Sequence, residues 1–295
     1  MMPAPRLDTA WDRATLDLER ACVRVCAAQS DALASLPETL RAGAPVPAAI
    51  GMLEASVRSR LEEYGFALCR DWPTAADDVR TGDEFAGFCS LFGVLRAQDG
   101  LDERWRFVQD RALITGVPGT SGSTGTMNID LHTENARPPH PPRLIALLCI
   151  RPAVLGGQSL LASGPAVRER IARDRPEHLP ALERPIPFGR RREDWSDGIE
   201  YDEQPVFSPG APFTLRYSRY WTDLAVEQSE LSLPPETAAA IDAVDELLAG
   251  TDIPVEFALA AGDALIVDNH VVMHGRREFE DDPAARRRLA RVWMD

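Results

Sequence analysis

The sequence predicts one α+β domain built on a β-barrel or a β-sandwich. Amphipathic helical patterns fill most of the N-terminal part, whereas short apolar runs broken by Gly, Pro, Ser and Thr dominate from about residue 106. Because helices mostly precede strands instead of alternating with them, a parallel βαβ sheet is disfavoured. We expect residues 1–295 to form a single domain, mainly helical over 1–92 and strand-rich over 93–295 with inserted helices.

Four elements are expected in the N-terminal part. Residues 8–36 are predicted to form a helix, because their apolar residues follow a period close to 3.6. A second amphipathic helix is predicted over residues 47–63 and ends before Gly65. A short buried strand at 66–69 and a third helix at 81–91 follow.

The strand-rich part begins with a loop at residues 116–128, which are rich in Gly, Ser and Thr. Residues 143–150 have the composition of a central strand. A glycine turn at 156–157 precedes another strand at 158–163, and a short helix is expected over 165–173.

The remaining segments are less regular. Residues 183–205 carry many charges and few periodic apolar positions, which predicts a mobile loop that could serve as a lid, or else an ordinary solvated loop. Pro235 lies in the first turn of a helix that runs to about Leu248. The end of the chain, 263–295, is predicted to form two strands joined by a polar loop at 278–286.

The bulk properties exclude several classes of partner. The net charge of −14 disfavours nucleic acid and anionic membranes, because no basic field is available to neutralise phosphates. The chain contains no apolar run long enough to span a membrane, and charged residues follow the N-terminus where a signal peptide would be apolar. The five cysteines are odd in number and lie in apolar settings, so buried free thiols in a reducing cytoplasm are expected.

The histidines suggest a metal site. His132 and Glu134 are two residues apart, so on a β-strand both side chains point to the same face. A distant histidine would complete a facial triad of two histidines and one carboxylate, with three open positions, as in non-haem Fe(II) oxygenases. The same ligands also suit zinc with water as the fourth ligand, and a His-x-Glu pair can occur by chance.

His270 and His274 are the candidates for the third ligand. They are four residues apart on a strand-like run, so they share a face in principle. Position 274 is favoured because it stands at the end of the strand, where a ligand can project into a cavity. The other two histidines, His140 and His178, lie among prolines and charged residues and are interpreted as surface residues.

An arginine-rich segment, residues 286–293, ends this acidic chain. A solvated terminus is the simple interpretation, but the apolar Leu289, Val292 and Trp293 are typical of a strand and require some arginines to point inward. A buried arginine needs an anion, and a guanidinium matches a carboxylate through a two-point contact. A dicarboxylate that bridges such an arginine and an open metal face is what a 2-oxoglutarate-dependent oxygenase requires.

These residues together resemble the taurine-dioxygenase-like superfamily of Fe(II)/2-oxoglutarate oxygenases. Within it they are most similar to the clavaminate-synthase-like branch, which includes β-hydroxylases of asparagine and arginine. The resemblance covers about residues 95–295 and implies a distorted double-stranded β-helix (jelly-roll) core with N-terminal and flanking helices. The matching segments are His132–Asn135, Arg151–Pro152, Gly156–Ser159, Asp268–Asn269, Val271–Arg276, and Arg287 with Arg291.

The resemblance also implies roles for individual residues. His132, Glu134 and His274 would hold Fe(II). Arg287 would bind the distal carboxylate of 2-oxoglutarate, with Arg288 as an alternative because the preceding loop looks one residue shorter than usual. Ser159 falls where the family has a threonine that hydrogen-bonds the co-substrate.

Substrate contacts are carried over in the same way. Arg291 and Gln98 fall near positions that contact the amino-acid substrate, and Asn135 ends the matching ligand motif. Relatives that hydroxylate basic amino acids carry aspartates after a strand ending in Arg-Tyr, but Arg219 and Tyr220 offer no anion there. We therefore expect Arg219 and Tyr220 among the contacts of a substrate whose side chain is neutral or anionic.

The function implied by the resemblance is hydroxylation of an unactivated carbon in an amino acid or an amino-acid-derived substrate, free or bound to a carrier protein, in specialised metabolism. Fe(II), 2-oxoglutarate and O2 would be required. Desaturation or oxidative cyclisation by the same chemistry is the first alternative. A zinc or manganese barrel acting as a hydrolase or isomerase, and a non-catalytic binding protein, are the others. The presence of Glu134 excludes the related halogenases, which have a small residue there.

Overall fold

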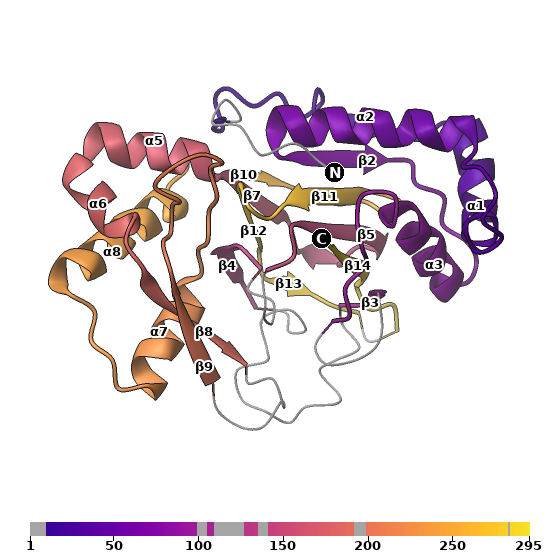
Figure 1. The fold of residues 1–295 in the computed structure, drawn as a ribbon. Coiled ribbons are helices and arrows are strands. Elements are labelled where there is room, and N and C mark those ends of the chain that lie inside the picture. The colour runs from indigo at the N-terminus through magenta and orange to yellow at the C-terminus, as the bar shows by residue number, and fades with distance from the viewer. Residues whose placement is uncertain (1–9, 99–104, 109–126, 135–140, 192–198, 283) are drawn as a thin grey trace.

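The computed structural model describes residues 10–98, 105–108, 127–134, 141–191, 199–282 and 284–295. Two main β-sheets with helices on their outer faces make up this part of the chain (Figure 1). Apart from the parallel pair β1–β2, the described strands pair antiparallel. The expected mixture of helices and non-alternating strands is therefore confirmed.

The larger sheet has six strands in the order β1-β2-β11-β5-β14-β3. Their bounds are Cys22–Arg24, Phe66–Arg70, Ala264–Asp268, Leu144–Arg151, Arg288–Met294 and Trp105–Phe107. One face is covered by α1 (Ala27–Arg41), α2 (Ala48–Tyr64) and α3 (Asp78–Cys89), as Figure 1 shows. Ala146 of β5 and Val292 of β14 share a buried apolar cluster with Leu53 and Phe88 of these helices. The opposite face is left for the second sheet.

The smaller sheet has four strands in the order β10-β7-β12-β4. Their bounds are Val255–Phe257, Ser159–Ser163, Val272–Arg276 and Ile129–His132. The helices α5 (Gly164–Asp174), α6 (Leu179–Leu182) and α8 (Pro235–Ala249) lie on this side of the molecule (Figure 1). A second apolar cluster includes Leu161 of β7 and Leu265 of β11, so the two sheets contribute to one core.

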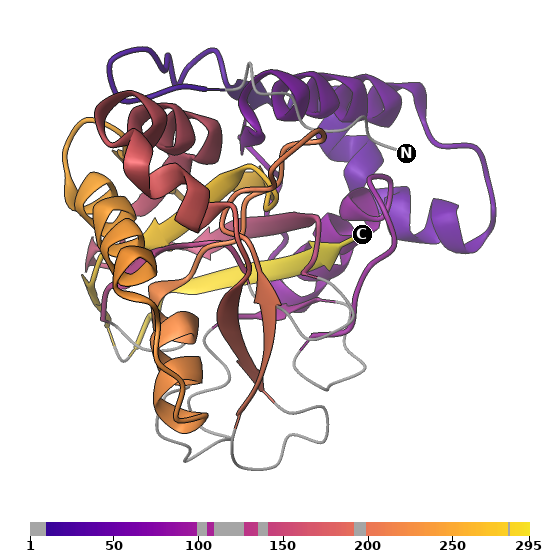
Figure 2. The same ribbon diagram turned by 60° about the vertical axis from the view of Figure 1, so that its left-hand side comes forward.

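Smaller elements complete the described structure. Strand β6 (Leu155–Gly156) pairs with β13 (Phe279–Glu280), and β8 (Ile186–Arg191) pairs with β9 (Ile199–Gln204). In Figure 2 the β8–β9 hairpin lies at the front of the molecule beside α7 (Arg219–Gln228). A short 3-10 helix covers Pro176–His178 and leaves His178 half-buried.

Most of the strongly periodic elements are confirmed. The helix expected over 47–63 is α2, and it ends before Gly65. The strands expected at 66–69, 143–150 and 158–163 correspond to β2, β5 and β7. The helices expected at 165–173 and from Pro235 to Leu248 correspond to α5 and α8, while α3 begins three residues before its expected start.

Three expectations about secondary structure were wrong. The predicted helix 8–36 is instead a set of turns followed by β1 and then α1, because Cys22–Arg24 pairs with β2 at the sheet edge. Within 183–205 the chain forms the β8–β9 hairpin, in which residues 186–189 are buried. The C-terminal segment 263–295 contains four strands rather than two. Most of the expected loop 116–128 lies outside the described residues.

The structure also bears on the expected free thiols and on the expected lack of a membrane-spanning segment. All five cysteines are free thiols, but the expected burial is wrong for Cys26, which is exposed, and for Cys22, which is half-buried. The buried Cys69, Cys89 and Cys149 have a raised pKa because burial disfavours the thiolate. Among the described helices, none combines the length and the apolar character that crossing a membrane requires.

Candidate metal centre

The two predicted ligand motifs meet where β4 pairs with β12. His132, the last residue of β4, lies opposite His274 in the antiparallel register, and their ring centroids are 4.5 Å apart. One ligand atom from each of His132, Glu134 and His274 lies within 4.8 Å of the other two. No other group of three potential metal ligands is found in the described part of the chain. The predicted triad is therefore assembled in the structure.

Backbone geometry permits this close pairing. The residue after His274 is Gly275, and a Cβ atom there would lie 2.7 Å from the carbonyl oxygen of Ile129. Any side chain at this position would push β4 away from β12, and the ligand histidine on β4 would move with it. Only His274 belongs to β12 and lies opposite β4. His270 lies in the turn before β12.

The imidazoles have an environment that suits a metal. Nδ1 of His132 lies 2.8 Å from the carbonyl oxygen of Asp130, an arrangement in which Nδ1 carries the proton and Nε2 keeps its lone pair for a metal. Nδ1 of His274 is buried without a protein partner among the described residues. Burial, aided by the charges of His132 and Arg291, lowers the pKa of His274 and favours the neutral ring that binds metals. Two imidazoles and one carboxylate are a ligand set that fits Fe(II).

Two residues outside the triad hold the backbone of Thr133 and Glu134 by hydrogen bonds. Asn269, buried after β11, accepts a hydrogen bond from the Glu134 N–H at 2.7 Å and donates to the Glu134 carbonyl at 3.2 Å. The backbone N–H of Tyr217 donates to Thr133 Oγ1 at 2.9 Å, and the Thr133 N–H donates to the Tyr217 carbonyl at 2.7 Å. These contacts hold the residues that set the angle between His132 and Glu134. The sequence indicated Asn269 and Tyr217 only as parts of longer motifs.

Arg291 and Gln98 lie together beside the triad, and their expected contact with a substrate stays a prediction. One guanidinium nitrogen of Arg291 lies 3.5 Å from a carboxylate oxygen of Glu134. Nε of Arg291 donates to Gln98 Oε1 at 2.9 Å, and the Gln98 amide donates to the Arg291 carbonyl at 2.9 Å. The guanidinium also lies over the Trp293 ring, 4.5 Å from its centroid. Arg291 and Gln98 are both buried, so these hydrogen bonds form a buried polar pair next to Glu134.

The structure distinguishes the two candidate arginines for the co-substrate. Arg288 points to the helical layer, where it pairs with Asp78 of α3 at 2.8 Å and lies over the Phe107 ring. Arg287 is buried and lies 5.2 Å from the centroid of Phe279. Its pKa is lowered chiefly by burial, with the charge of Asp281 acting in the opposite direction. Arg287 is thus the candidate for binding an anion, together with the buried Ser159 of β7.

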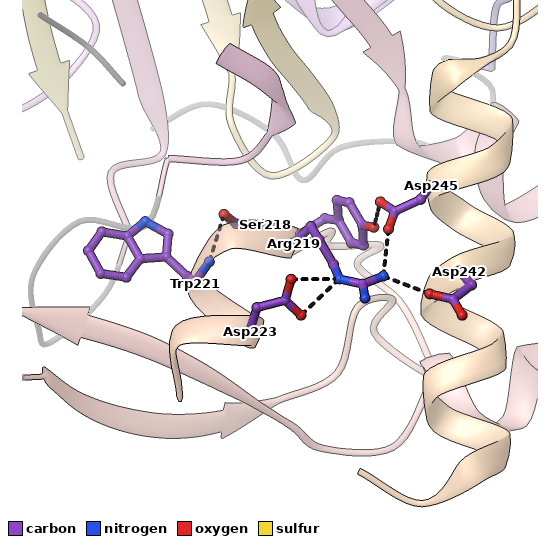
Figure 3. Close-up of polar contacts among 7 residues, drawn as sticks. Ser218, Arg219, Trp221, Asp223, Asp242 and Asp245 are labelled. Atoms are coloured by element: carbon purple, nitrogen blue, oxygen red, sulfur yellow. Dashed lines mark hydrogen bonds and ion pairs between the residues drawn. The ribbon is translucent and has the colours of Figure 1, made fainter. Parts of the chain in front are cut away.

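Arg219 has a different place from the one expected. Its Nε contacts both carboxylate oxygens of Asp223 at 2.8 and 2.9 Å, and one terminal nitrogen contacts Asp242 and Asp245 at 2.7 Å each (Figure 3). The Tyr217 hydroxyl donates to the same Asp245. The Arg219 side chain therefore joins α7 to α8, and its expected contact with a substrate stays a prediction. The Tyr220 ring is 48% exposed and lies against Trp221, and Asn135 is outside the described residues.

Comparison with known proteins agrees with this geometry. The family described as "Taurine catabolism dioxygenase TauD, TfdA family" matches residues 37–293. The chain belongs to this family. A uridine-5'-phosphate dioxygenase from Streptomyces sp is 29% identical over 248 residues, which are 78% of this chain and 85% of the relative.

Solved structures show that this TauD/TfdA-family chain shares the fold of amino-acid oxygenases. An asparagine oxygenase in complex with Fe(II), hydroxyasparagine and succinate has a TM-score of 0.64 at 18% identity, with 93% of each chain covered. The non-heme iron oxygenase OrfP, in complex with Fe, succinate and a dihydroxyarginine, has a TM-score of 0.65 at 15% identity, with 93% of this chain and 94% of that chain covered.

The Asn269 contacts give a first prediction for this TauD/TfdA-family enzyme. We expect Asn269→Ala to weaken Fe(II) binding by about 10–100-fold, because the Glu134 backbone loses the contacts that orient its carboxylate. Anaerobic titration with Fe(II) measures the affinity. Asn128→Ala is the matched control, since Asn128 also accepts a backbone hydrogen bond, from Glu278, but at an exposed position. Equal affinities of the two variants would refute the positioning role of Asn269.

The Arg219 network gives a second prediction. We expect Arg219→Met to reduce the free energy of unfolding by about 1 kcal/mol, the upper end for exposed pairs, because three carboxylates lose a shared cation. The KM for substrate should stay within about twofold of the wild type, because the guanidinium already pairs with these carboxylates. A tenfold change in KM would correspond to about 1.4 kcal/mol. Urea unfolding and steady-state kinetics test both parts. A large rise in KM with unchanged stability would instead make Arg219 a substrate contact.

Proposed function

We propose that this chain is an Fe(II)- and 2-oxoglutarate-dependent dioxygenase that hydroxylates an unactivated carbon of an amino acid or an amino-acid-derived substrate. The convergence of His132, Glu134 and His274 within 4.8 Å carries this proposal. Membership of the dioxygenase family and the fold shared with asparagine oxygenase and OrfP support it.

In this proposal His132, Glu134 and His274 hold Fe(II) on one face. Three coordination positions then remain for 2-oxoglutarate and O2, and the bound iron supplies the oxidative chemistry. The residues of the chain provide geometry: Asp130 orients the His132 ring, while Asn269 holds the Glu134 backbone. The Nδ1 atom of His274 is buried, although the residue as a whole is half-buried.

Arg287 and Ser159 would bind the distal carboxylate of 2-oxoglutarate. Arg287 is buried and has no carboxylate partner for its guanidinium among the described residues, so an anionic ligand would supply the missing contact. The buried Ser159 lies on β7, which is separated from β4 by one strand, β12. Glu134 lies in the loop that follows β4. The asparagine oxygenase and OrfP complexes contain succinate, which is a dicarboxylate of the same kind.

Arg291 and Gln98 would contact the substrate, with its carboxylate next to the Arg291 guanidinium. Arg106 of β3 lies directly opposite Arg291 in the antiparallel register, so both side chains point to the same face, and both are buried. A cationic side chain would be repelled by this pair. The substrate side chain is therefore proposed to be neutral or anionic, and one relative is named for an anionic substrate, uridine-5'-phosphate.

The finer architecture also belongs to this proposal. Two packed and mostly antiparallel sheets support a distorted double-stranded β-helix in a single domain over 1–295. The two solved structures, each of which aligns with 93% of this chain, support it as well. The five free thiols support a reducing cytoplasm as its setting.

The test is succinate formation from 2-oxoglutarate in the presence of Fe(II), ascorbate and O2, over a panel of neutral, acidic and basic amino acids and their phosphorylated derivatives. We expect succinate to rise with one neutral or acidic class, and the product mass to increase by one oxygen atom. A loss of two hydrogens would indicate desaturation or cyclisation. If no candidate gives succinate and anaerobic Fe(II) with 2-oxoglutarate gives no visible charge-transfer band, the oxygenase proposal is wrong.

A further inference from the structure

The carboxylate of the triad lies beyond the end of its strand. His132 is the last residue of β4 and the last that pairs with β12, so Thr133 and Glu134 follow the sheet instead of belonging to it. Asn269 bonds to the backbone of Glu134. On the other side, the backbone of Tyr217 bonds to Thr133. The position of Tyr217 therefore affects the position of the Glu134 carboxylate.

Tyr217 is held at both of its ends. Three hydrogen bonds join its backbone to Thr133: Oγ1 accepts from the Tyr217 N–H at 2.9 Å, and the Tyr217 carbonyl accepts from the Thr133 N–H at 2.7 Å and from Oγ1 at 3.3 Å. The tyrosine is 2% exposed, and its hydroxyl donates to one carboxylate oxygen of Asp245 on α8. Burial and the charge of Asp245 raise the pKa of this hydroxyl, so it keeps the proton that it donates.

Asp245 is a well-supported acceptor. Its other carboxylate oxygen accepts from Arg219 at 2.7 Å, and the same guanidinium contacts Asp242 at 2.7 Å, one turn earlier on α8 (Figure 3). Ile241 and Val244 of this helix are buried in the same apolar cluster as Tyr217. A hydroxyl that donates to a carboxylate makes a stronger hydrogen bond than one that donates to a neutral acceptor. The helix α8 thus supplies a fixed, charged anchor for the tyrosine.

We propose that Asp245 is a positioning residue of the metal centre, which acts through the Tyr217 hydroxyl and Thr133 on the orientation of Glu134. This inference rests on the proposed function, because it takes Glu134 as a ligand of Fe(II). Loss of the hydroxyl contact lets the Tyr217 backbone shift, and Thr133 follows because three hydrogen bonds join the two residues. Contacts of this outer kind change metal affinity without touching the metal.

The experiment is an anaerobic Fe(II) titration of the full chain. Tyr217→Phe removes the hydroxyl and keeps the ring, Asp245→Leu removes the acceptor, and the double variant lacks both. Asp242→Leu is the matched control, because Asp242 lies on the same helix and contacts the same Arg219. Asp245→Asn keeps an acceptor oxygen and serves as the conservative variant. Circular dichroism and urea unfolding give the fold and the stability of each protein.

We expect Tyr217→Phe and Asp245→Leu each to raise the Kd for Fe(II) about tenfold, the lower end of the effect of outer contacts at a metal site. The double variant should have the same Kd as either single variant, because both changes break one hydrogen bond. Asp245→Asn should recover most of the affinity. Asp242→Leu should bind Fe(II) as the wild type does, even where its free energy of unfolding is lower.

The visible charge-transfer band of the protein with Fe(II) and 2-oxoglutarate is a second measurement, because its maximum depends on ligand geometry and not on global stability. We expect the maximum to shift in Tyr217→Phe and to stay in place in Asp242→Leu. Wild-type affinity and band in Tyr217→Phe would overturn the inference. Additive effects in the double variant, or an equal loss of affinity in Asp242→Leu, would overturn it too, and all three leave the oxygenase function intact. A wild type that binds no Fe(II) would overturn the proposed function, and the inference with it.

Discussion

Replacing Glu134 by alanine should abolish 2-oxoglutarate turnover while leaving the protein folded. The carboxylate supplies one of three atoms that lie within 4.8 Å of one another, and alanine leaves only the two imidazoles. Because the oxidative chemistry depends on the bound metal, we expect turnover to fall at least about a thousandfold, which corresponds to about 4 kcal/mol of activation free energy. Glu134 is only half-buried, so the substitution creates no large apolar cavity and stability should change little.

Succinate formation and Fe(II) content measure this effect. Glu134→Asp is the informative control, because it keeps a carboxylate on a side chain one methylene shorter and should retain measurable iron and activity. Circular dichroism on all three proteins separates a lost site from a lost fold. Full turnover by Glu134→Ala would show that this residue is not a metal ligand.

Replacing Arg287 by methionine should raise the Kd for 2-oxoglutarate by about two to four orders of magnitude. A two-point contact between a guanidinium and a carboxylate contains two charge-assisted hydrogen bonds, each worth about 1.5–3 kcal/mol. Methionine has a similar length and fills the space beside Phe279 without the charge. Since burial already opposes the Arg287 charge in the free protein, its removal should not destabilise the fold strongly.

Arg288→Met is the matched control for this prediction. Arg288 is the next residue, but its charge pairs with Asp78 in the helical layer. The Kd for 2-oxoglutarate should therefore stay within about twofold, and only the free energy of unfolding should fall, by about 0.5–1 kcal/mol. Titration of the charge-transfer band compares the two variants. If Arg288→Met loses co-substrate binding and Arg287→Met keeps it, the assignment of the two arginines must be reversed.

Part of the site could be predicted from local sequence alone. His132 and Glu134 are separated by the two-residue period of a strand, which predicts that their side chains share a face. In the structure β4 ends at His132, and hydrogen bonds with Tyr217 and Asn269 hold Thr133 and Glu134 beyond it. The choice between His270 and His274 could not be made from the period, because the run was taken as one strand. In the structure a turn contains His270, and β12 begins at Val272, so only His274 is placed opposite His132.

Other contacts depend on how distant elements pack. Arg219 follows a motif that marks substrate contacts in relatives, yet its acceptors Asp242 and Asp245 lie on α8. A helical period predicts that α8 exists and says nothing about which loop it packs against. The same reason applies to β1, whose three residues form a strand only because β2 lies beside them.

Tyr217 determines which parts of this protein can be exchanged with a relative. Its backbone is bonded to Thr133, between two of the proposed iron ligands, while its hydroxyl contacts Asp245 on α8. An engineered chimera that replaced Tyr217 and α7 but retained the native α8 would leave Asp245 without this donor. The segment from Tyr217 through the end of α8 should therefore be exchanged as one piece. Chimera libraries that aim to alter substrate choice should keep this segment together.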